Sequence, residues 1–197
     1  MLSENREKFE RVSEKVGKIF SKTGISPNTF TFFSLIFAVL SFIFIVKNNF
    51  ILAATFFIIA SFLDLIDGAV AKFKNVTTKT GAYLDTICDR YVEAIFLLGF
   101  LFLPMPRIYI DSKFWVFLAL FGSLMTTYAK AAGKEKEILK EELKKGLLER
   151  PERLFLIFLS LILGIFSFSW VIYPIIFLAV FSNVTAIQRI YFIFRTE

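Results

Sequence analysis

The sequence contains no histidine and a single cysteine, Cys88. Without histidine, the imidazole ligands that commonly bind zinc and copper are missing, and one thiol makes no disulfide framework. We interpret Cys88 as a packing residue, because free cysteine behaves as a small buried apolar side chain. We also find no internal repeat and no Ser/Gly-rich linker, and we expect no cleavable signal peptide, because residues 1–24 are charged throughout.

What the chain has in abundance is apolar side chains. Of its 197 residues 56% are hydrophobic, 27 are phenylalanine, and the mean hydropathy is +0.67. Soluble domains usually contain ~45–50% apolar residues, so we predict an all-α integral membrane protein. Stretches of about 20 apolar residues are long enough to cross a bilayer as helices. Six such stretches lie at residues 27–47, 50–72, 82–104, 112–132, 153–169 and 170–194.

Lysine and arginine are unevenly distributed between the segments that connect these spans. They are frequent before the first span and in residues 73–81 and 133–152, whereas the opposite connections carry only Lys47, Arg107 and Lys113. By the positive-inside rule, we predict a multi-pass protein of the cell membrane with both termini in the cytoplasm. The polar residues of the 82–104 span would then open toward the cytoplasm as well.

The segment before the first span has helical periodicity of its own. Apolar residues recur among charges at Phe9, Val12, Val16, Ile19 and Phe20. This spacing predicts an amphipathic helix over residues 3–22 that lies on the membrane surface, although a solvated charged tail is the alternative. We therefore divide the chain into a juxtamembrane helix, residues 1–24, and a six-helix membrane domain, residues 25–197.

Acidic and small residues follow helical stripes inside the apolar segments. Asp64, Asp67, Gly68 and Ala71 have the spacing i, i+3, i+4, i+7, and a second stripe contains Gly81, Asp85 and Asp89 at i, i+4, i+8. Four unpaired carboxylates at membrane depth would cost roughly 10 kcal/mol, so cations must compensate them. Oxygen ligands favour hard ions, and four carboxylates balance two divalent cations, which predicts two Mg²⁺ or Mn²⁺ ions where the stripes face each other.

Written out, the stripes read D-L-I-D-G-A-V-A-K from Asp64 to Lys72, followed by Gly81, Asp85 and Asp89. This pattern resembles the motif of the CDP-alcohol phosphatidyltransferase family, and Ser26-Pro27-Asn28-Thr29 resembles the start of the family's first span. The one departure is Lys72, where the family usually has arginine. Lysine keeps the charge but lacks the planar fork that binds a phosphate with two hydrogen bonds.

The resemblance implies transfer of a phosphatidyl-type group from a CDP-linked lipid to an alcohol, with release of CMP. It makes Asp64, Asp67 and Asp85 metal ligands, and Asp89 the catalytic general base and a further ligand of the second ion. The implied CDP-binding residues are Asp64, Asp67, Gly68, Ala71, Lys72, Gly81 and Asn28. The small residues would let the nucleotide approach the helix backbones, and tight helix packing is the alternative interpretation of these positions.

The segment Gly146–Leu154 and Lys130 resemble the corresponding parts of phosphatidylinositol-phosphate and archaetidylinositol-phosphate synthases. This resemblance implies inositol phosphate as the acceptor, with its phosphate bound by Lys130, Arg150, Arg153 and Arg189. Basic residues at cytoplasmic span ends are also expected from membrane orientation alone. The residues themselves leave open whether the lipid carries diacylglycerol or archaeol chains.

Several alternatives and partners complete this interpretation. Glycerol phosphate, serine or another alcohol could replace inositol phosphate as acceptor, and a divalent-cation transporter would also carry intramembrane carboxylates. The resemblance implies a homodimer among membrane lipids, and we expect no nucleic-acid partner. Glu93 continues the stripe of Asp85 and Asp89, and we expect it to pair with a base such as Lys130 or to be protonated.

Overall fold

The computed structural model describes residues 13–74, 76, 78–139 and 146–195, and these residues are almost entirely helical. Within them the β-structure is limited to an isolated bridge between Ile108 and Ile110. The all-α prediction is therefore confirmed. The helices are α2 (Pro27–Val46), α3 (Phe50–Phe73), α4 (Lys79–Phe100), α5 (Ser112–Glu135), α6 (Arg150–Phe166), the short 3₁₀ helix η1 (Phe168–Trp170) and α7 (Ile172–Phe194).

Local sequence signals set where the helices begin. The Ser26 side chain accepts a hydrogen bond from the Thr29 backbone N–H, with Pro27 in the first turn of α2. The Thr78 side chain caps α4 in the same way by accepting from the N–H of Gly81. Such caps satisfy backbone donors that have no partner within the helix. Ser26 and Thr78 lie at the same end of the bundle as Asp67 and Asp85, so the two caps fix the backbone around these acidic residues.

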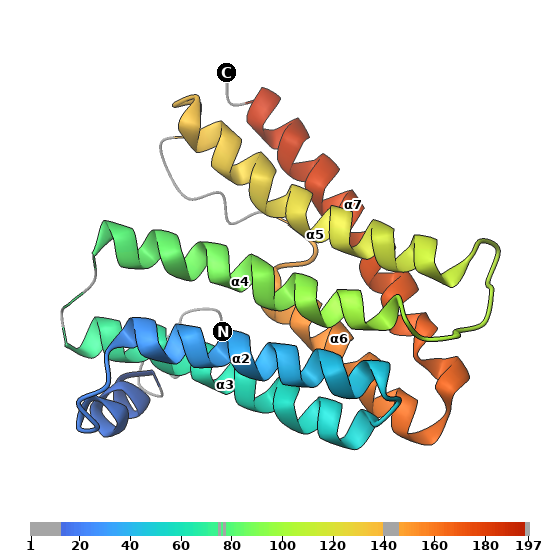
Figure 1. Cartoon of the computed structure of the whole chain (residues 1–197). Coiled ribbons are helices and arrows are strands. Elements are labelled where there is room, and N and C mark those ends of the chain that lie inside the picture. Colours follow the sequence, from blue (N-terminus) through green and yellow to red (C-terminus); the bar gives the residue numbers. More distant parts are fainter. Residues whose placement is uncertain (1–12, 75, 77, 140–145, 196–197) are drawn as a thin grey trace.

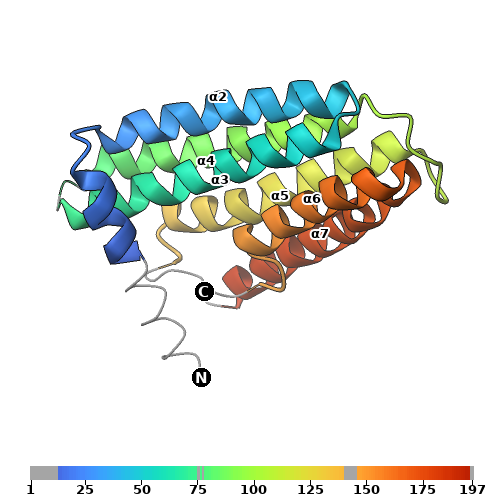
Figure 2. The ribbon, with the colours of Figure 1, turned by 90° about the horizontal axis from the view of Figure 1, so that it is seen from below.

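The helices form one bundle in which α2 packs against α3 and α4, and α5 packs against α7 (Figure 1). Seen from below, α6 lies between α3 and α7 and closes the bundle (Figure 2). The core between them is aromatic. Phe57 of α3 stacks on Phe158 of α6 at a ring distance of 5.7 Å and meets Phe96 of α4 at 4.4 Å. These contacts hold α3, α4 and α6 against one another in the core.

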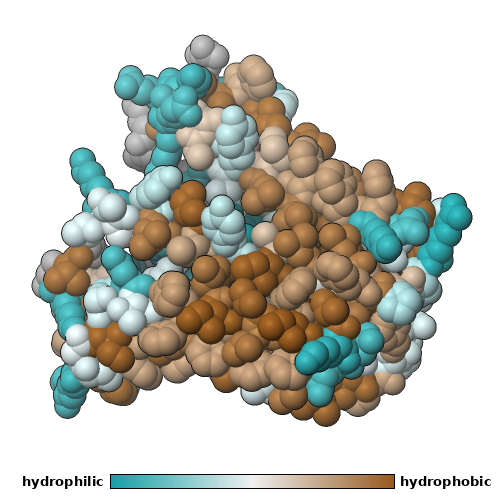
Figure 3. Space-filling model, in the orientation of Figure 1, coloured by the Kyte–Doolittle hydropathy of each residue, from teal (hydrophilic) through white to brown (hydrophobic). Residues whose placement is uncertain are grey.

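Four helical segments are long and apolar enough to cross a membrane: Pro27–Val46, Phe50–Phe73, Ser112–Glu135 and Phe168–Phe194. The chain is therefore a multi-pass membrane protein. An apolar band covers the middle of the face shown in Figure 3, and hydrophilic residues gather toward both ends. The predicted spans at residues 82–104 and 153–169 do not meet these criteria, because α4 carries several charged residues and α6 has only 17 residues. Both helices also begin three residues earlier than predicted.

Residues 13–21 are helical, and they pack against the first turn of α2 and the C-terminal half of α3. Val16 and Phe20 pack against the buried cluster of Phe30, Ile66 and Val70. A Cβ atom at Gly17 would lie 2.5 Å from the Ala69 carbonyl oxygen, so the helix sits directly on the α3 backbone. Residues 3–12 of the predicted amphipathic helix, with Phe9 and Val12, lie outside the described residues. Its position on a membrane surface stays a prediction.

Gly122 of α5 and Asn183 of α7 form a close contact between these two helices. A Cβ atom at Gly122 of α5 would lie 2.6 Å from the Asn183 side-chain nitrogen of α7. That nitrogen donates hydrogen bonds to the carbonyl oxygens of Leu118 at 2.9 Å and Ala179 at 2.8 Å. Gly122 is thus a packing glycine, because any side chain there would push α5 and α7 apart.

Candidate metal and nucleotide site

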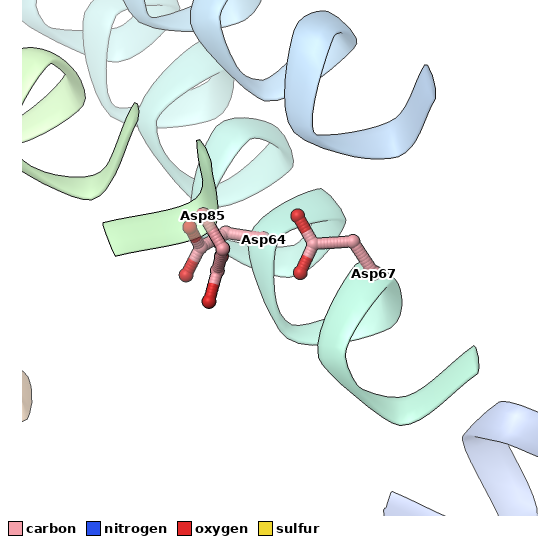
Figure 4. Close-up of side chains that lie close together, drawn as sticks. All are labelled: Asp64, Asp67 and Asp85. Carbon is pink, nitrogen blue, oxygen red and sulfur yellow. The ribbon is translucent and has the colours of Figure 1, made fainter. Parts of the chain in front are cut away.

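Three carboxylates from two helices converge near one end of the bundle. Asp64 and Asp67 project from α3 and Asp85 projects from α4, and each offers an oxygen within 4.8 Å of the others (Figure 4). Asp67 is only 4% exposed, and one of its oxygens accepts a 2.6 Å hydrogen bond from the Thr31 hydroxyl. The predicted meeting of the two acidic stripes is therefore confirmed.

The donor set of this cluster fits a hard divalent cation. All three groups offer carboxylate oxygens, the ligands that Mg²⁺ and Mn²⁺ prefer. Three negative charges at this separation in a partly buried site repel each other strongly, and a bound cation would relieve that repulsion. The sequence-based prediction of a metal-binding aspartate cluster is thus supported by geometry, with Asp64, Asp67 and Asp85 as the residues that would hold an ion.

Among the described residues, Asp89 is not one of the carboxylates whose oxygens lie close enough together to share one ion. It lies one helical turn from Asp85, and its Oδ1 forms an ion pair with Arg150 at 2.8 Å. Its Oδ2 lies 3.3 Å from the Arg90 guanidinium, which also donates to the Thr127 hydroxyl. Asp89 is thus placed beside the metal cluster and held by two arginines.

Arg150, predicted to bind the acceptor phosphate, contacts the acidic cluster directly. Its two terminal nitrogens donate to the two oxygens of Asp64 at 2.9 and 3.1 Å, and the pair with Asp89 completes a bridge. Bidentate pairs of this kind fix orientation as well as charge. The first residue of α6 therefore joins α3 and α4 at the site, a contact between residues far apart in sequence.

A cavity of about 620 Å³ opens beside Asp67 and Asp85. It is lined by the beginnings of α2 and α4 and by the end of α3, and it includes six of the seven predicted CDP-binding residues: Asn28, Asp67, Gly68, Ala71, Lys72 and Gly81. The seventh, Asp64, is not a lining residue and instead faces Arg150. The structure adds Thr31 and Thr78 to the lining. Thr31 could have been noticed as a polar residue inside an apolar span, but its hydrogen bond to Asp67 could not be predicted from the sequence.

Of the two glycines of the motif, Gly68 has open space in front of it and Gly81 does not. A Cβ atom at Gly68 would meet nothing within 4 Å, apart from its own helix backbone, and Gly68 lines the cavity. At Gly81 the nearest atoms would be the Thr78 hydroxyl at 3.0 Å and the Asn28 side-chain oxygen at 3.8 Å. Tight helix packing therefore does not account for Gly68, which favours the alternative of a ligand that approaches the α3 backbone.

We expect Gly68→Leu to fold normally and to bind CDP-lipid at least tenfold more weakly, because the new side chain would extend into the cavity. Thermal unfolding in detergent should change little, since leucine has space there and is a better helix former than glycine. Gly122→Leu is the matched control: it should unfold at a markedly lower temperature because the side chain would separate α5 from α7. Unchanged CDP-lipid binding by Gly68→Leu would contradict the assignment of the cavity.

The remaining predicted basic residues gather around Thr126 of α5. Arg153 donates to the Thr126 hydroxyl at 3.2 Å, and Arg189 of α7 donates to the Thr126 carbonyl oxygen at 2.6 Å. Lys130 is half-buried one turn farther along α5. Glu93 pairs with a basic group, as predicted, and that group is Arg153 rather than the example named, Lys130. This pairing depends on which face of α6 turns inward, and the position of Arg153 in the sequence does not indicate that face.

Comparison with known proteins gives a consistent result. The family model for CDP-alcohol phosphatidyltransferase matches residues 24–187. The archaetidylinositol phosphate synthase of Pyrococcus horikoshii is 32% identical over 194 residues, which cover 97% of this chain and 95% of the relative. A bifunctional IPC transferase and DIPP synthase of Aquifex aeolicus is 36% identical over 144 residues, which span 71% of this chain but only 32% of that longer protein.

Solved structures share the fold at low sequence identity. The phosphatidylinositol phosphate synthase of Mycobacterium tuberculosis with CDP-DAG bound superposes with a TM-score of 0.77 at 22% identity, and the match covers 93% of this chain and 94% of that one. The same enzyme in complex with manganese and citrate gives a TM-score of 0.78, with coverage of 92% and 88%.

Proposed function

The chain belongs to the CDP-alcohol phosphatidyltransferase family, and we propose that it transfers a phosphatidyl-type group from a CDP-activated lipid to inositol phosphate. The observation that carries this proposal is the cavity in which Asp67 and Asp85 lie beside the open backbone of Gly68. Metal-ligand carboxylates and free space next to a helix backbone are what a nucleotide diphosphate requires. Membership in this enzyme family also displaces the transporter alternative.

The donor would enter with its cytidine diphosphate in the cavity and its lipid chains toward the apolar surface of the bundle. Asn28, Gly68, Ala71, Lys72 and Gly81 would contact the nucleotide, and Lys72 supplies positive charge to the diphosphate. The CDP-DAG bound to the M. tuberculosis relative supports a donor of this type in the shared fold. The lipid chains are proposed to be diacylglycerol or archaeol, since both meet only apolar side chains.

In the reaction, the acceptor hydroxyl oxygen would form a bond to the lipid-side phosphorus while the bond from that phosphorus to CMP breaks. Asp89, with Arg150 and Arg90 on its two oxygens, would accept the hydroxyl proton. Asp64, Asp67 and Asp85 would hold Mg²⁺ or Mn²⁺, with Asp89 beside a second ion, and the cations would neutralise the diphosphate charge. The manganese complex of the M. tuberculosis relative supports this choice of metal.

If this metal assignment is right, Mn²⁺ or Mg²⁺ with CDP-lipid should raise the unfolding temperature, and EDTA should reverse the gain. Ligands that bind only the native state stabilise it by mass action, by about 2.7 kcal/mol at a hundred times the dissociation constant. Differential scanning fluorimetry on detergent-purified protein measures this shift. An unfolding temperature that ignores both metal and chelator would contradict the assignment.

For the acceptor, we propose that Lys130, Arg150, Arg153 and Arg189 form a basic site for the phosphate of inositol phosphate. The hydrogen bonds of Arg153 and Arg189 to Thr126 bring two of these cations together, and Lys130 follows on the same helix. The name of the P. horikoshii relative supports an inositol phosphate product. Charge-assisted hydrogen bonds to phosphate are strong and directional, which suits arginine.

The placement of the enzyme in the cell follows from the same proposal. We propose six membrane-spanning helices, a juxtamembrane helix at residues 1–24 ahead of the membrane domain at 25–197, and cytoplasmic termini and active site. A soluble acceptor such as inositol phosphate would then reach the cavity directly. A homodimer is proposed by family resemblance alone.

The bifunctional relative from A. aeolicus favours one further candidate, in which the donor or the alcohol acceptor differs while the reaction remains the same. The test is CMP release from CDP-lipid with Mg²⁺ or Mn²⁺ and a panel of inositol phosphate, glycerol phosphate, serine and unphosphorylated inositol. We expect the highest kcat/KM for inositol phosphate. Equal use of unphosphorylated inositol would contradict the phosphate site, and preference for another alcohol would replace the acceptor.

A further inference from the structure

Glu93 is a buried carboxylate that has no part in the proposed chemistry. It lies on α4 one turn beyond Asp89, and its side chain is 2% exposed. Burying a lone charge in the apolar interior of a bundle is strongly unfavourable unless the charge is paired and hydrogen-bonded. The chain therefore has a reason to keep an acid here, and the contacts of Glu93 indicate what that reason is.

Both oxygens of Glu93 are used by one arginine. Arg153 donates from Nε to Oε1 at 2.6 Å and from Nη2 to Oε2 at 3.0 Å, a fork-to-fork pair in which both side chains are 2% exposed. This geometry fixes the plane of the guanidinium. The third nitrogen, Nη1, then points to the Thr126 hydroxyl at 3.2 Å and the Leu148 carbonyl oxygen at 3.5 Å.

Thr126 also contacts the second buried arginine, Arg189. Its carbonyl oxygen accepts from Arg189 Nη1 at 2.6 Å, and Arg189 Nη2 donates to Glu149 Oε1 at 2.8 Å. Two guanidinium groups from α6 and α7 are thus held on either side of one α5 residue. Glu93 supplies the buried negative charge at the end of this chain of contacts, and without it the two cations would lack part of their compensation.

We propose that Glu93 is a positioning residue for the acceptor site: through Arg153 and Thr126, it sets the orientation of the basic residues that bind the acceptor phosphate. The inference rests on the proposed function. Glu93 touches no substrate in this account, and it acts by limiting Arg153 to one orientation. A purely structural tie between α4 and α6 is the competing explanation, and it predicts a loss of stability without a change in acceptor binding.

Glu93→Gln separates these explanations, because glutamine keeps the shape and removes the charge. We expect the KM for inositol phosphate to rise about tenfold, with kcat and the KM for CDP-lipid changed less than twofold. Glu93→Asp keeps the charge on a shorter side chain and should recover part of the loss. Thr126→Val preserves side-chain shape while removing the hydroxyl, so it should raise the same KM by a smaller factor.

Leu161→Ala is the matched control, because Leu161 is fully buried in the hydrophobic core two turns farther along α6. It should lower the unfolding temperature and leave both KM values unchanged. If Glu93→Gln behaves as Leu161→Ala does, or raises both KM values equally, the positioning role is overturned. Should Glu93→Gln fail to fold, Thr126→Val decides alone by the same criterion. Failure of the proposed function would appear differently, as wild-type protein that makes no product from inositol phosphate.

Discussion

Asp85→Asn is expected to reduce CMP release by about a thousandfold or more, and Asp67→Asn should have a similar effect. Each substitution removes one negative charge from carboxylates whose oxygens lie within 4.8 Å of one another. Metal ions contribute several kcal/mol to the stabilisation of phosphoryl transfer, and each 1.36 kcal/mol corresponds to a factor of ten in rate. Both variants should still fold and insert, because losing like-charge repulsion does not destabilise the metal-free protein.

The measurement is CMP release at saturating CDP-lipid and acceptor, together with the Mn²⁺ concentration needed for half-maximal activity. Asp111→Asn is the matched control, because Asp111 is an exposed cap of α5 outside the cavity. It should retain activity. Ordinary turnover of Asp85→Asn at ordinary metal concentration would count against the metal site.

Arg153→Ala should lower the free energy of unfolding by about 3–5 kcal/mol, since it would leave Glu93 buried without its partner. The sequence alone predicts a different main effect, a higher KM for the acceptor, because it places Arg153 among the phosphate-binding residues. Because Arg153 pairs with the buried Glu93, we expect the main effect to be a loss of stability. Any loss of acceptor binding would then be measured on a destabilised protein.

Thermal or denaturant unfolding in detergent tests this prediction. Arg107→Ala serves as the control, because it removes an arginine that is solvent-exposed, and its effect should be within about 0.5 kcal/mol. The double variant Glu93→Leu, Arg153→Leu should recover much of the stability, since apolar residues can replace a buried ion pair. A loss in Arg153→Ala no larger than in Arg107→Ala would show that the pair contributes little.

The local parts of the site were predictable because helical periodicity is a local property. The spacing of Asp64, Asp67 and Asp85 placed them on facing stripes, and the structure confirms that their carboxylates meet. The small size of Gly68 left two explanations, and only the empty space in front of it in three dimensions favoured the ligand. That these segments are helices was equally predictable, whereas the exact start of α4 depends on the Thr78 side-chain cap and α6 begins with Pro151 in its first turn.

The contacts that cross the bundle were not predictable from one sequence. Arg150 meets Asp64, and Arg153 meets Glu93, across 86 and 60 residues of chain respectively. Which arginine of α6 faces which acid depends on how that helix is rotated about its axis. Arg150 and Arg153 are three residues apart and therefore project from the helix in different directions. Tertiary packing sets this rotation, so the basic residues could be named as a group but not assigned individual partners.

The most direct test of the proposed reaction is the stoichiometry of its two products. Purified protein with CDP-lipid, Mn²⁺ and inositol phosphate should yield CMP and a phosphorylated inositol lipid in equal amounts by mass spectrometry. Omitting either the metal or the acceptor should stop both products. CMP release that continues without acceptor, or an inositol phosphate that remains unincorporated while CMP accumulates, would contradict the account.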